Sequence, residues 1–243
     1  MAHRIALDEQ ALGFPLSDLA SRALGEVLII SGEEADHARR VKRLEIGDRV
    51  TLLTGRGTTA LAEVADARRD FRVRLLSIDA APPVTPAVDV LAATPKGPRL
   101  DDMIDALAQA GARSWRPLRT KLGVVDPREG KLARMERIAR EASKQSLRAW
   151  DLALLEPVDF AAAIAPTSPG LLVIADRDAR PYPRAGAAEI RLLIGPEGGW
   201  TPAELAQARE AGAVAASFGP HTMRIELAAA IACAIVLDIE RRA

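Results

Sequence analysis

The sequence of 243 residues has few of the side chains that form disulfides, bind metal ions or stack on bases. A single cysteine, Cys233, excludes a disulfide framework, and three scattered histidines predict no metal site. Aromatic residues make up 3% of the chain, too few for the stacking platforms of proteins that bind single-stranded nucleic acids. These absences exclude small disulfide-rich proteins and cysteine-ligated metal enzymes.

Long apolar runs and an excess of one charge are also missing. The longest uncharged apolar run, Leu227–Leu237, has 11 residues, whereas a membrane span needs about 20. The first ten residues lack an apolar core, so we expect no signal peptide, no membrane segment and a cytoplasmic protein. The chain has 33 basic and 33 acidic side chains, which argues against a wholly basic nucleic-acid binder.

A proline-rich stretch, 80–86, predicts a linker between two domains, because its three prolines stiffen the chain and remove backbone donors. Before this linker, short apolar or alternating segments predict strands at Val27–Ile30, Val50–Leu53, Thr59–Val64 and Phe71–Ile78. Ser31, followed three residues later by Glu34, predicts a capping box at the start of one short helix. Residues 1–79 are therefore expected to form a small β-rich domain.

After the linker, apolar strands alternate with helices. The expected strands are Val88–Ala92, Leu171–Ala175 and Ile190–Ile194. The expected helices are Leu100–Gln109, Lys131–Leu147 with Leu132 on its buried face, a helix that begins at a capping box of Thr201 and Glu204, and Leu227–Ile239. Trp115, Trp150 and Cys233 are expected to pack in the interior. This alternation predicts a mostly parallel α/β sheet in residues 87–243.

Two glycine-containing loops follow apolar strands, where open α/β sheets bind ligands. The first, Gly195-Pro196-Glu197-Gly198-Gly199, lacks the Gly-Lys-Ser/Thr of a phosphate loop, and its glutamate would repel a pyrophosphate. It suits a ligand with hydroxyl groups or positive charge, such as an adenosyl sulfonium, although a tight connection without a ligand explains the spacing equally well. The second loop leads to Arg224 and Glu226 before an apolar helix, where the glutamate could simply stabilise the helix dipole.

These two loops together resemble those of the SPOUT class of RNA methyltransferases. Within that class the chain is most similar to the enzymes that methylate N3 of a uridine in 16S ribosomal RNA, and His37, Lys42-Arg43 and Gly47-Asp48 match their N-terminal domain. The resemblance implies an RNA-binding PUA-like β-barrel domain at residues 1–79 and a SPOUT α/β trefoil-knot methyltransferase domain at residues 87–243. It also implies S-adenosyl-L-methionine as cofactor, ribosomal RNA or the small ribosomal subunit as partner, and a homodimer.

The roles of individual residues follow from the same resemblance. It implies that the cofactor is bound by Gly195, Glu197, Gly198, Gly199, Phe218, Gly219 and Met223. Arg224 would lie nearest the target base and stabilise the charge of the deprotonated uracil, while Glu226 would orient Arg224 or accept the proton.

Several polar positions depart from the family pattern. Arg224-Ile225-Glu226-Leu227 stands where the family usually has Arg-Thr-Glu-Thr, and Asp176-Arg177 replaces a His-Pro-like pair. The loop histidine His221 replaces a usual arginine, and we expect it to be a plain loop residue rather than a base. These departures leave two alternatives open: methylation of a different RNA, and an RNA-binding protein that has lost catalysis.

Basic side chains gather in one segment of the neutral chain. Residues 113–148 carry 11 basic and 4 acidic side chains, a surplus that favours contact with RNA phosphates over a merely solvated helix face. The residues expected to contact RNA are Arg39, Arg43, Arg134, Arg137, Lys144 and Arg148.

Overall fold

The computed structural model describes residues 3–123, 125, 132–166 and 170–242, which form two structural units. Unit 1 comprises Met1–Pro83 and Ser143–Asp151, and unit 2 comprises Val84–Ala142 and Leu152–Ala243. The chain first leaves unit 1 inside the proline-rich stretch. Residues 143–151 belong to unit 1 again, whereas the sequence pattern predicts two domains that follow each other without such an exchange.

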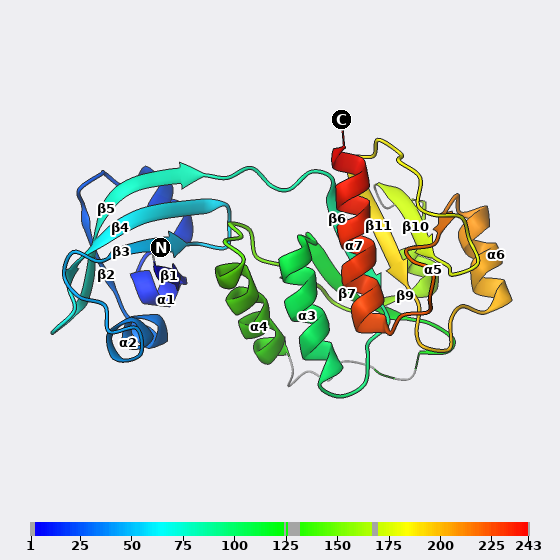
Figure 1. Ribbon diagram of the computed structural model, residues 1–243, viewed down its shortest axis with the longest axis horizontal. Helices are drawn as coiled ribbons and strands as arrows, with labels where there is room; N and C mark the ends of the chain where they lie inside the picture. Colours follow the sequence, from blue (N-terminus) through cyan, green and yellow to red (C-terminus); the bar gives the residue numbers. More distant parts are fainter. Residues whose placement is uncertain (1–2, 124, 126–131, 167–169, 243) are drawn as a thin grey trace. The chain divides into compact units, whose positions relative to one another are not determined.

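Unit 1 is built on a five-stranded sheet with the order β1-β3-β4-β5-β2 (Figure 1). Its strands are β1 (His3–Ala6), β2 (Val27–Ile30), β3 (Arg49–Leu53), β4 (Thr58–Asp66) and β5 (Phe71–Ala80). The four expected strands are confirmed, and β1 is an additional strand that runs parallel to β3. The end strands of the sheet are β1 and β2, and no pairing joins them in the described residues, so the expected PUA-like β-barrel takes the form of a half-barrel sheet.

Short helices cover the apolar face of this sheet. They are α1 (Glu9–Leu12), the 3-10 helix η1 (Leu16–Ser21) and α2 (Gly32–Arg40). Ser31 is the N-cap of α2, but its side chain makes no capping hydrogen bond, so the expected capping box is wrong. The carboxylate of Glu34 instead accepts a hydrogen bond from the ammonium group of Lys144.

Unit 2 contains a seven-stranded sheet with the order β12-β10-β11-β6-β7-β8, and β9 also pairs with β7. Its strands are β6 (Ala87–Ala92), β7 (Ser114–Arg119), β8 (Ala153–Leu154), β9 (Val158–Asp159), β10 (Leu171–Ala175), β11 (Glu189–Ile194) and β12 (Val214–Ala216). Every pairing in it is parallel, which confirms the expected α/β architecture. The sequence pattern missed β7, because Arg116 and Pro117 interrupt its apolar residues.

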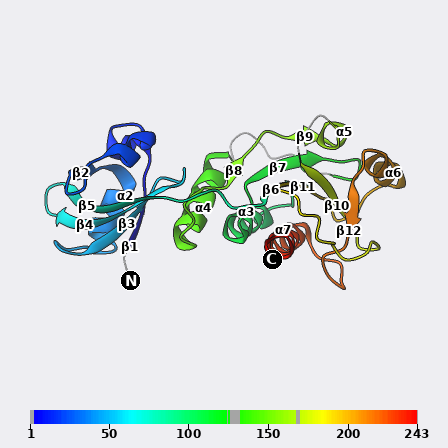
Figure 2. The same ribbon diagram turned by 90° about the horizontal axis from the view of Figure 1, so that it is seen from above.

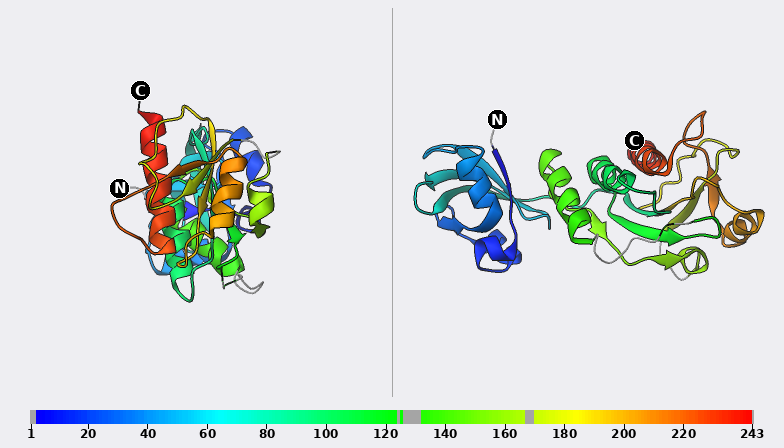
Figure 3. Two further views of the ribbon diagram at one scale, coloured as in Figure 1. Left: turned by 90° about the vertical axis from the view of Figure 1, so that its right-hand side faces the viewer. Right: turned by 90° about the horizontal axis from the view of Figure 1, so that it is seen from below.

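Helices cover both faces of the sheet in unit 2 (Figure 2). The helices are α3 (Arg99–Ala110), α4 (Leu132–Gln145), α5 (Phe160–Ala163), α6 (Pro202–Glu210) and α7 (Ile225–Arg241). Residues of α3, α4 and α7 pack with Ile190 and Leu192 on one face, whereas α5 and α6 pack with Leu193 on the other. Figure 3 shows α6 and α7 on opposite sides of the strands. Because both faces are buried, β10 and β11 are apolar at consecutive positions.

The ends of the helices in unit 2 follow the sequence closely. Thr201 and Glu204 form the expected capping box at the start of α6. Gly111 ends α3 in the left-handed conformation, with φ of 98°. Cys233 and Trp115 are buried as expected, but Leu132 of α4 is exposed rather than buried. Among the described helices, none is long and apolar enough to cross a membrane.

Candidate functional site

A cavity of about 410 Å³ lies at the carboxyl edge of the sheet in unit 2. Its walls come from the segments that follow three neighbouring strands: residues 175–178 after β10, 194–200 after β11 and 216–223 after β12, apart from Pro220. Leu205 of α6 and two alanines of α7 complete the lining. Because β10 lies between β12 and β11, the three loops meet at one edge, where open α/β sheets bind their ligands.

The residues that the resemblance assigns to the cofactor all line this cavity. They are Gly195, Glu197, Gly198, Gly199, Phe218, Gly219 and Met223. Gly199 has φ of 72°, a left-handed backbone conformation that favours glycine. The carboxylate of Glu197 lies 3.5 Å from the guanidinium group of Arg99 at the start of α3. This partly exposed ion pair is one contact between the glycine-rich loop and α3.

The charged groups of the cavity are mostly negative. Asp176, Asp178 and Glu197 line it together with the basic side chains of Arg177 and His221. The Nε of Arg177 donates to Oδ1 of Asp178 at 3.2 Å, and its Nη1 donates to Oγ1 of Thr222 at 3.3 Å. Asp178 pairs with Arg177 and Glu197 pairs with Arg99, but the carboxylates that line the cavity still outnumber its arginine. The cavity therefore suits a ligand that carries positive charge and hydroxyl groups. Within the described residues, no group of three or more His, Cys, Asp or Glu could hold a metal ion.

Arg224 and Glu226 lie at the start of α7, outside the residues that line the cavity. Arg224 is the N-cap, is exposed and makes no side-chain capping bond. Glu226 is half-buried, and its Oε2 is a buried atom with no hydrogen-bond partner in the described part of the chain. Among the described contacts, Arg224 and Glu226 form no ion pair with each other. Both groups thus remain available to a bound substrate, and their roles stay predictions.

A buried carboxylate, Glu204, connects the start of α6 to the segment after β7. Its Oε2 accepts from the backbone nitrogen and hydroxyl of Thr201, both at 2.8 Å, and its Oε1 accepts from the backbone nitrogen of Lys121 at 2.9 Å. Burial by itself would raise the pKa of Glu204, but these hydrogen bonds outweigh burial and hold the pKa below its ordinary value. The segment after β7 is thereby fixed beside the glycine-rich loop, where Leu122 would touch any side chain at position 198.

Sequence reasoning missed three groups of this cavity. Asp176–Asp178 follow an expected apolar strand, so the rule that ligands bind at strand ends would have identified them. Trp200 and Leu205 line the cavity from the far end of the glycine-rich loop and from α6. No local pattern marks these two residues, because ordinary core packing explains an isolated aromatic or aliphatic side chain.

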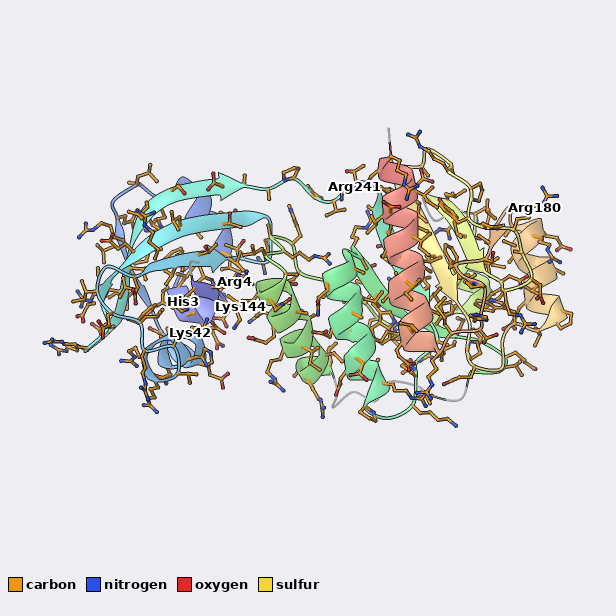
Figure 4. The ribbon with its side chains drawn as sticks, viewed as in Figure 1. His3, Arg4, Lys42, Lys144, Arg180 and Arg241 are labelled. Atoms are coloured by element: carbon orange, nitrogen blue, oxygen red, sulfur yellow. The ribbon has the colours of Figure 1, made fainter. Side chains whose placement is uncertain are left out.

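The expected RNA contact Lys144 is 8% exposed in unit 1 and has a structural partner there. Its Nζ lies 2.7 Å from Oε1 of Glu34. Arg4 donates to the backbone oxygens of Lys144 and Gln145, while Nζ of Lys42 donates to the backbone oxygen of Arg4 at 2.6 Å (Figure 4). This network anchors residues 143–145 to the sheet of unit 1. Lys144 therefore has little surface left for a phosphate, contrary to the expectation.

Of the other five residues expected to contact RNA, three have a hydrogen-bond or ion-pair partner within the protein. Arg39 pairs with Asp36 at 2.6 Å, Arg134 pairs with Asp101, and Arg148 donates to the backbone oxygen of Trp150. Arg43 and Arg137 are exposed. In the described part of 113–148, Lys144, Arg134 and Arg148 thus have partners within the fold, although the side chain of Arg134 is still 62% exposed. The contact of this segment with RNA stays a prediction.

Lys144→Gln is expected to lower the free energy of unfolding by about 2 kcal/mol, because it leaves the half-buried carboxylate of Glu34 without its cation. Arg137→Gln on the exposed side of the same helix is the matched control and should change it by less than about 0.5 kcal/mol. Urea unfolding of both variants measures the difference. Unchanged stability of Lys144→Gln, together with weaker binding of 16S ribosomal RNA, would contradict the structural role.

Comparison with known proteins identifies both parts of the chain. Residues 83–237 match the family model described as an RNA methyltransferase domain, and residues 30–76 match the RNA methyltransferase PUA domain. The chain is 34% identical over 226 residues to the ribosomal RNA small subunit methyltransferase E of Mycobacterium bovis, covering 87% of this chain and 86% of that protein. It is 30% identical over 210 residues to the protein of the same name from Synechocystis, covering 82% and 68%.

Two solved structures share the fold. The ribosomal RNA small subunit methyltransferase E from Neisseria gonorrhoeae, bound to S-adenosyl methionine, superposes with a TM-score of 0.82 at 23% identity and covers 97% of this chain and 96% of its own. A putative methyltransferase from Legionella pneumophila, also with the bound cofactor, gives 0.80 at 24% identity and covers 98% of both chains. These matches confirm the expected fold class, a PUA-like sheet followed by a parallel SPOUT α/β domain. The chain belongs to the ribosomal RNA small subunit methyltransferase E family of RNA methyltransferases.

Proposed function

We propose that this protein transfers a methyl group from S-adenosyl-L-methionine to N3 of a uridine in 16S ribosomal RNA. The observation that carries this proposal is the cavity at the carboxyl edge of the parallel sheet, lined by every residue that the resemblance assigns to the cofactor. The family supports the substrate, since the relatives are named as methyltransferases of small-subunit ribosomal RNA.

The residues of the cavity match the chemistry of this cofactor, which supplies a methyl group on a positively charged sulfur. The carboxylates of Asp176, Asp178 and Glu197 provide the negative charge and the acceptors that a sulfonium, an ammonium group and ribose hydroxyls require. Phe218 and Met223 provide apolar surface for an adenine ring. Gly199 lets the backbone approach the ligand closely, because no other residue occupies the space beside its Cα.

The residues at the start of α7 would act on the target base. The imino nitrogen of uracil must lose its proton before or while it attacks the methyl carbon. The guanidinium group of Arg224 would stabilise the negative charge that then spreads onto the ring oxygens. The unpartnered carboxylate oxygen of Glu226 would orient Arg224 or accept the proton. Because the displacement is in line, fixing base and methyl group in one geometry is a large part of catalysis.

Exposed cations around the same edge of the sheet favour the approach of RNA. Lys96 follows β6, Lys121 follows β7 and Arg224 follows β12, and all three are exposed. Because the strands are parallel, these side chains belong to the edge that also carries the cavity. Phosphates bound by such cations would hold a nucleotide at the cavity while the walls keep their negative charge.

Three finer parts of the proposal come from the family resemblance alone. They are the trefoil-knot threading of unit 2, a homodimer, and activity in the cytoplasm, where ribosomal subunits are found. Sedimentation of the purified protein tests the dimer.

Deletion of the gene from its host tests the function. Mass spectrometry of digested 16S ribosomal RNA should show that one N3-methyluridine disappears, and the wild-type chain should restore it. Calorimetry of the purified protein with S-adenosylmethionine is the companion measurement. Cofactor binding without any change in methyluridine would indicate a different RNA substrate, and no cofactor binding would indicate an RNA-binding protein without catalysis.

A further inference from the structure

Trp200 contacts two elements around the cavity and directly precedes the N-cap of a third. Its indole Nε1 donates to the backbone oxygen of Ala175, the last residue of β10, at 2.8 Å. Its ring lies 5.5 Å from that of Phe160 in α5, measured between centroids, with the two planes tilted by 51°. The next residue, Thr201, caps α6. Trp200 is half-buried and lines the cavity itself.

The indole ring also occupies the space that a side chain at position 195 would need. A Cβ at Gly195 would lie 3.0 Å from Cε2 of Trp200 and 3.2 Å from its Cδ2. The backbone of Gly195 is not in the left-handed region, so the close approach of the ring is what disfavours a larger residue here: the ring would have to shift by a few tenths of an ångström. Gly195 and Trp200 form one packed pair that begins and ends the glycine-rich loop.

The pair joins two walls of the cavity, which follow the neighbouring strands β10 and β11. One wall, residues 176–178, continues from Ala175, and the other wall, residues 195–199, lies between Gly195 and Trp200. The hydrogen bond from Trp200 to Ala175 sets the distance between the end of β10 and the end of this loop. Without it, the loop would have to be ordered when the ligand binds, and that ordering weakens affinity.

We propose that Trp200 is a positioning residue that holds the glycine-rich loop in its binding conformation, so that it controls affinity for the cofactor rather than the methyl-transfer step. This inference rests on the proposed function, because the ligand it names is S-adenosylmethionine. It assigns to Trp200 a role that no local pattern in the sequence indicates.

Trp200→Phe tests the inference, because phenylalanine keeps an aromatic ring over Gly195 but removes the N–H donor. The dissociation constant for S-adenosylmethionine should rise about tenfold, while kcat at saturating cofactor and KM for 16S ribosomal RNA stay unchanged. Trp150→Phe is the matched control, since the indole of Trp150 also donates to a backbone oxygen at 2.8 Å, that of Ala81 in unit 1. It should leave cofactor affinity unchanged.

Gly195→Ala is a second variant that perturbs the same loop, because the added methyl group forces the indole ring to shift by a few tenths of an ångström. It should also weaken cofactor binding while the Tm stays near that of Trp150→Phe. Equal cofactor affinity in Trp200→Phe and the wild type would overturn the inference, as would a fall in kcat with affinity unchanged. Absence of binding in the wild type would instead count against the proposed function.

Discussion

Arg224→Ala is expected to slow methyl transfer to 16S ribosomal RNA by about 100- to 1,000-fold, because a cation that stabilises the developing charge on the uracil ring is lost. Affinity for S-adenosylmethionine should stay unchanged, since Arg224 is not among the residues that line the cavity. Stability should change little, because the side chain makes no capping hydrogen bond and is exposed. Single-turnover methylation of small ribosomal subunits, combined with calorimetry, separates these effects.

Two further variants make this result specific. Arg224→Lys keeps the positive charge but loses the planar fork of donors, so its rate should lie between those of the wild type and the alanine variant. Arg209→Ala, on the exposed side of α6, controls for the loss of a surface cation and should retain the wild-type rate. If Arg224→Ala methylates at the wild-type rate, Arg224 has no role in methyl transfer.

The second large effect is expected at Glu240, a buried carboxylate at the end of α7. Its Oε1 accepts from the hydroxyl of Tyr182 at 2.8 Å and from the backbone nitrogen of Ala185 at 2.7 Å, and its Oε2 accepts from the backbone nitrogen of Gly186 at 2.7 Å. Tyr182 stacks on Phe218, which lines the cavity. One side chain thus holds the loop that connects β10 to β11.

Glu240→Ala is expected to lower the free energy of unfolding by about 3 kcal/mol, because the buried hydroxyl of Tyr182 and two partly buried backbone N–H groups lose their acceptor. Tyr182→Phe removes one of these bonds and should cost about 1 kcal/mol. Glu210→Ala, an exposed carboxylate on α6, is the surface control. Denaturant unfolding of the three variants measures the differences, and equal stability of Glu240→Ala and Glu210→Ala would contradict the anchoring role.

The stability that Glu240 contributes should also depend on pH, in a direction that its pKa determines. Burial alone would raise the pKa of Glu240, but the hydrogen bonds from Ala185, Tyr182 and Gly186 outweigh burial and hold the pKa below its ordinary value. The ionised carboxylate therefore stabilises the fold above that ordinary value, and its contribution disappears as the pH falls through the lower pKa. Between about pH 5 and pH 3, the wild type should lose more stability than Glu240→Ala.

Local patterns in the sequence were sufficient for most elements of the fold. Continuous apolar runs marked β10 and β11 because both faces of a parallel sheet are covered by helices. The capping box of Thr201 and Glu204 formed because both partners lie within one turn. At Ser31 the same pattern failed, since the carboxylate of Glu34 is bound by Lys144, a residue 110 positions later in the chain. The capping-box pattern spans four residues, so it cannot take account of a competing partner so far away in the sequence.

For the candidate site, the sequence by itself determined the two loops and the family, since glycines and charged residues at strand ends are read directly from their order. Only the tertiary structure decided which charges remain exposed. Lys144, expected to contact RNA, is buried against Glu34, while Trp200, which had no assigned role in the site, joins two walls of the cavity. The physical reason is that pairing and burial depend on neighbours brought together by strand order, and a single sequence records residue types without those distances.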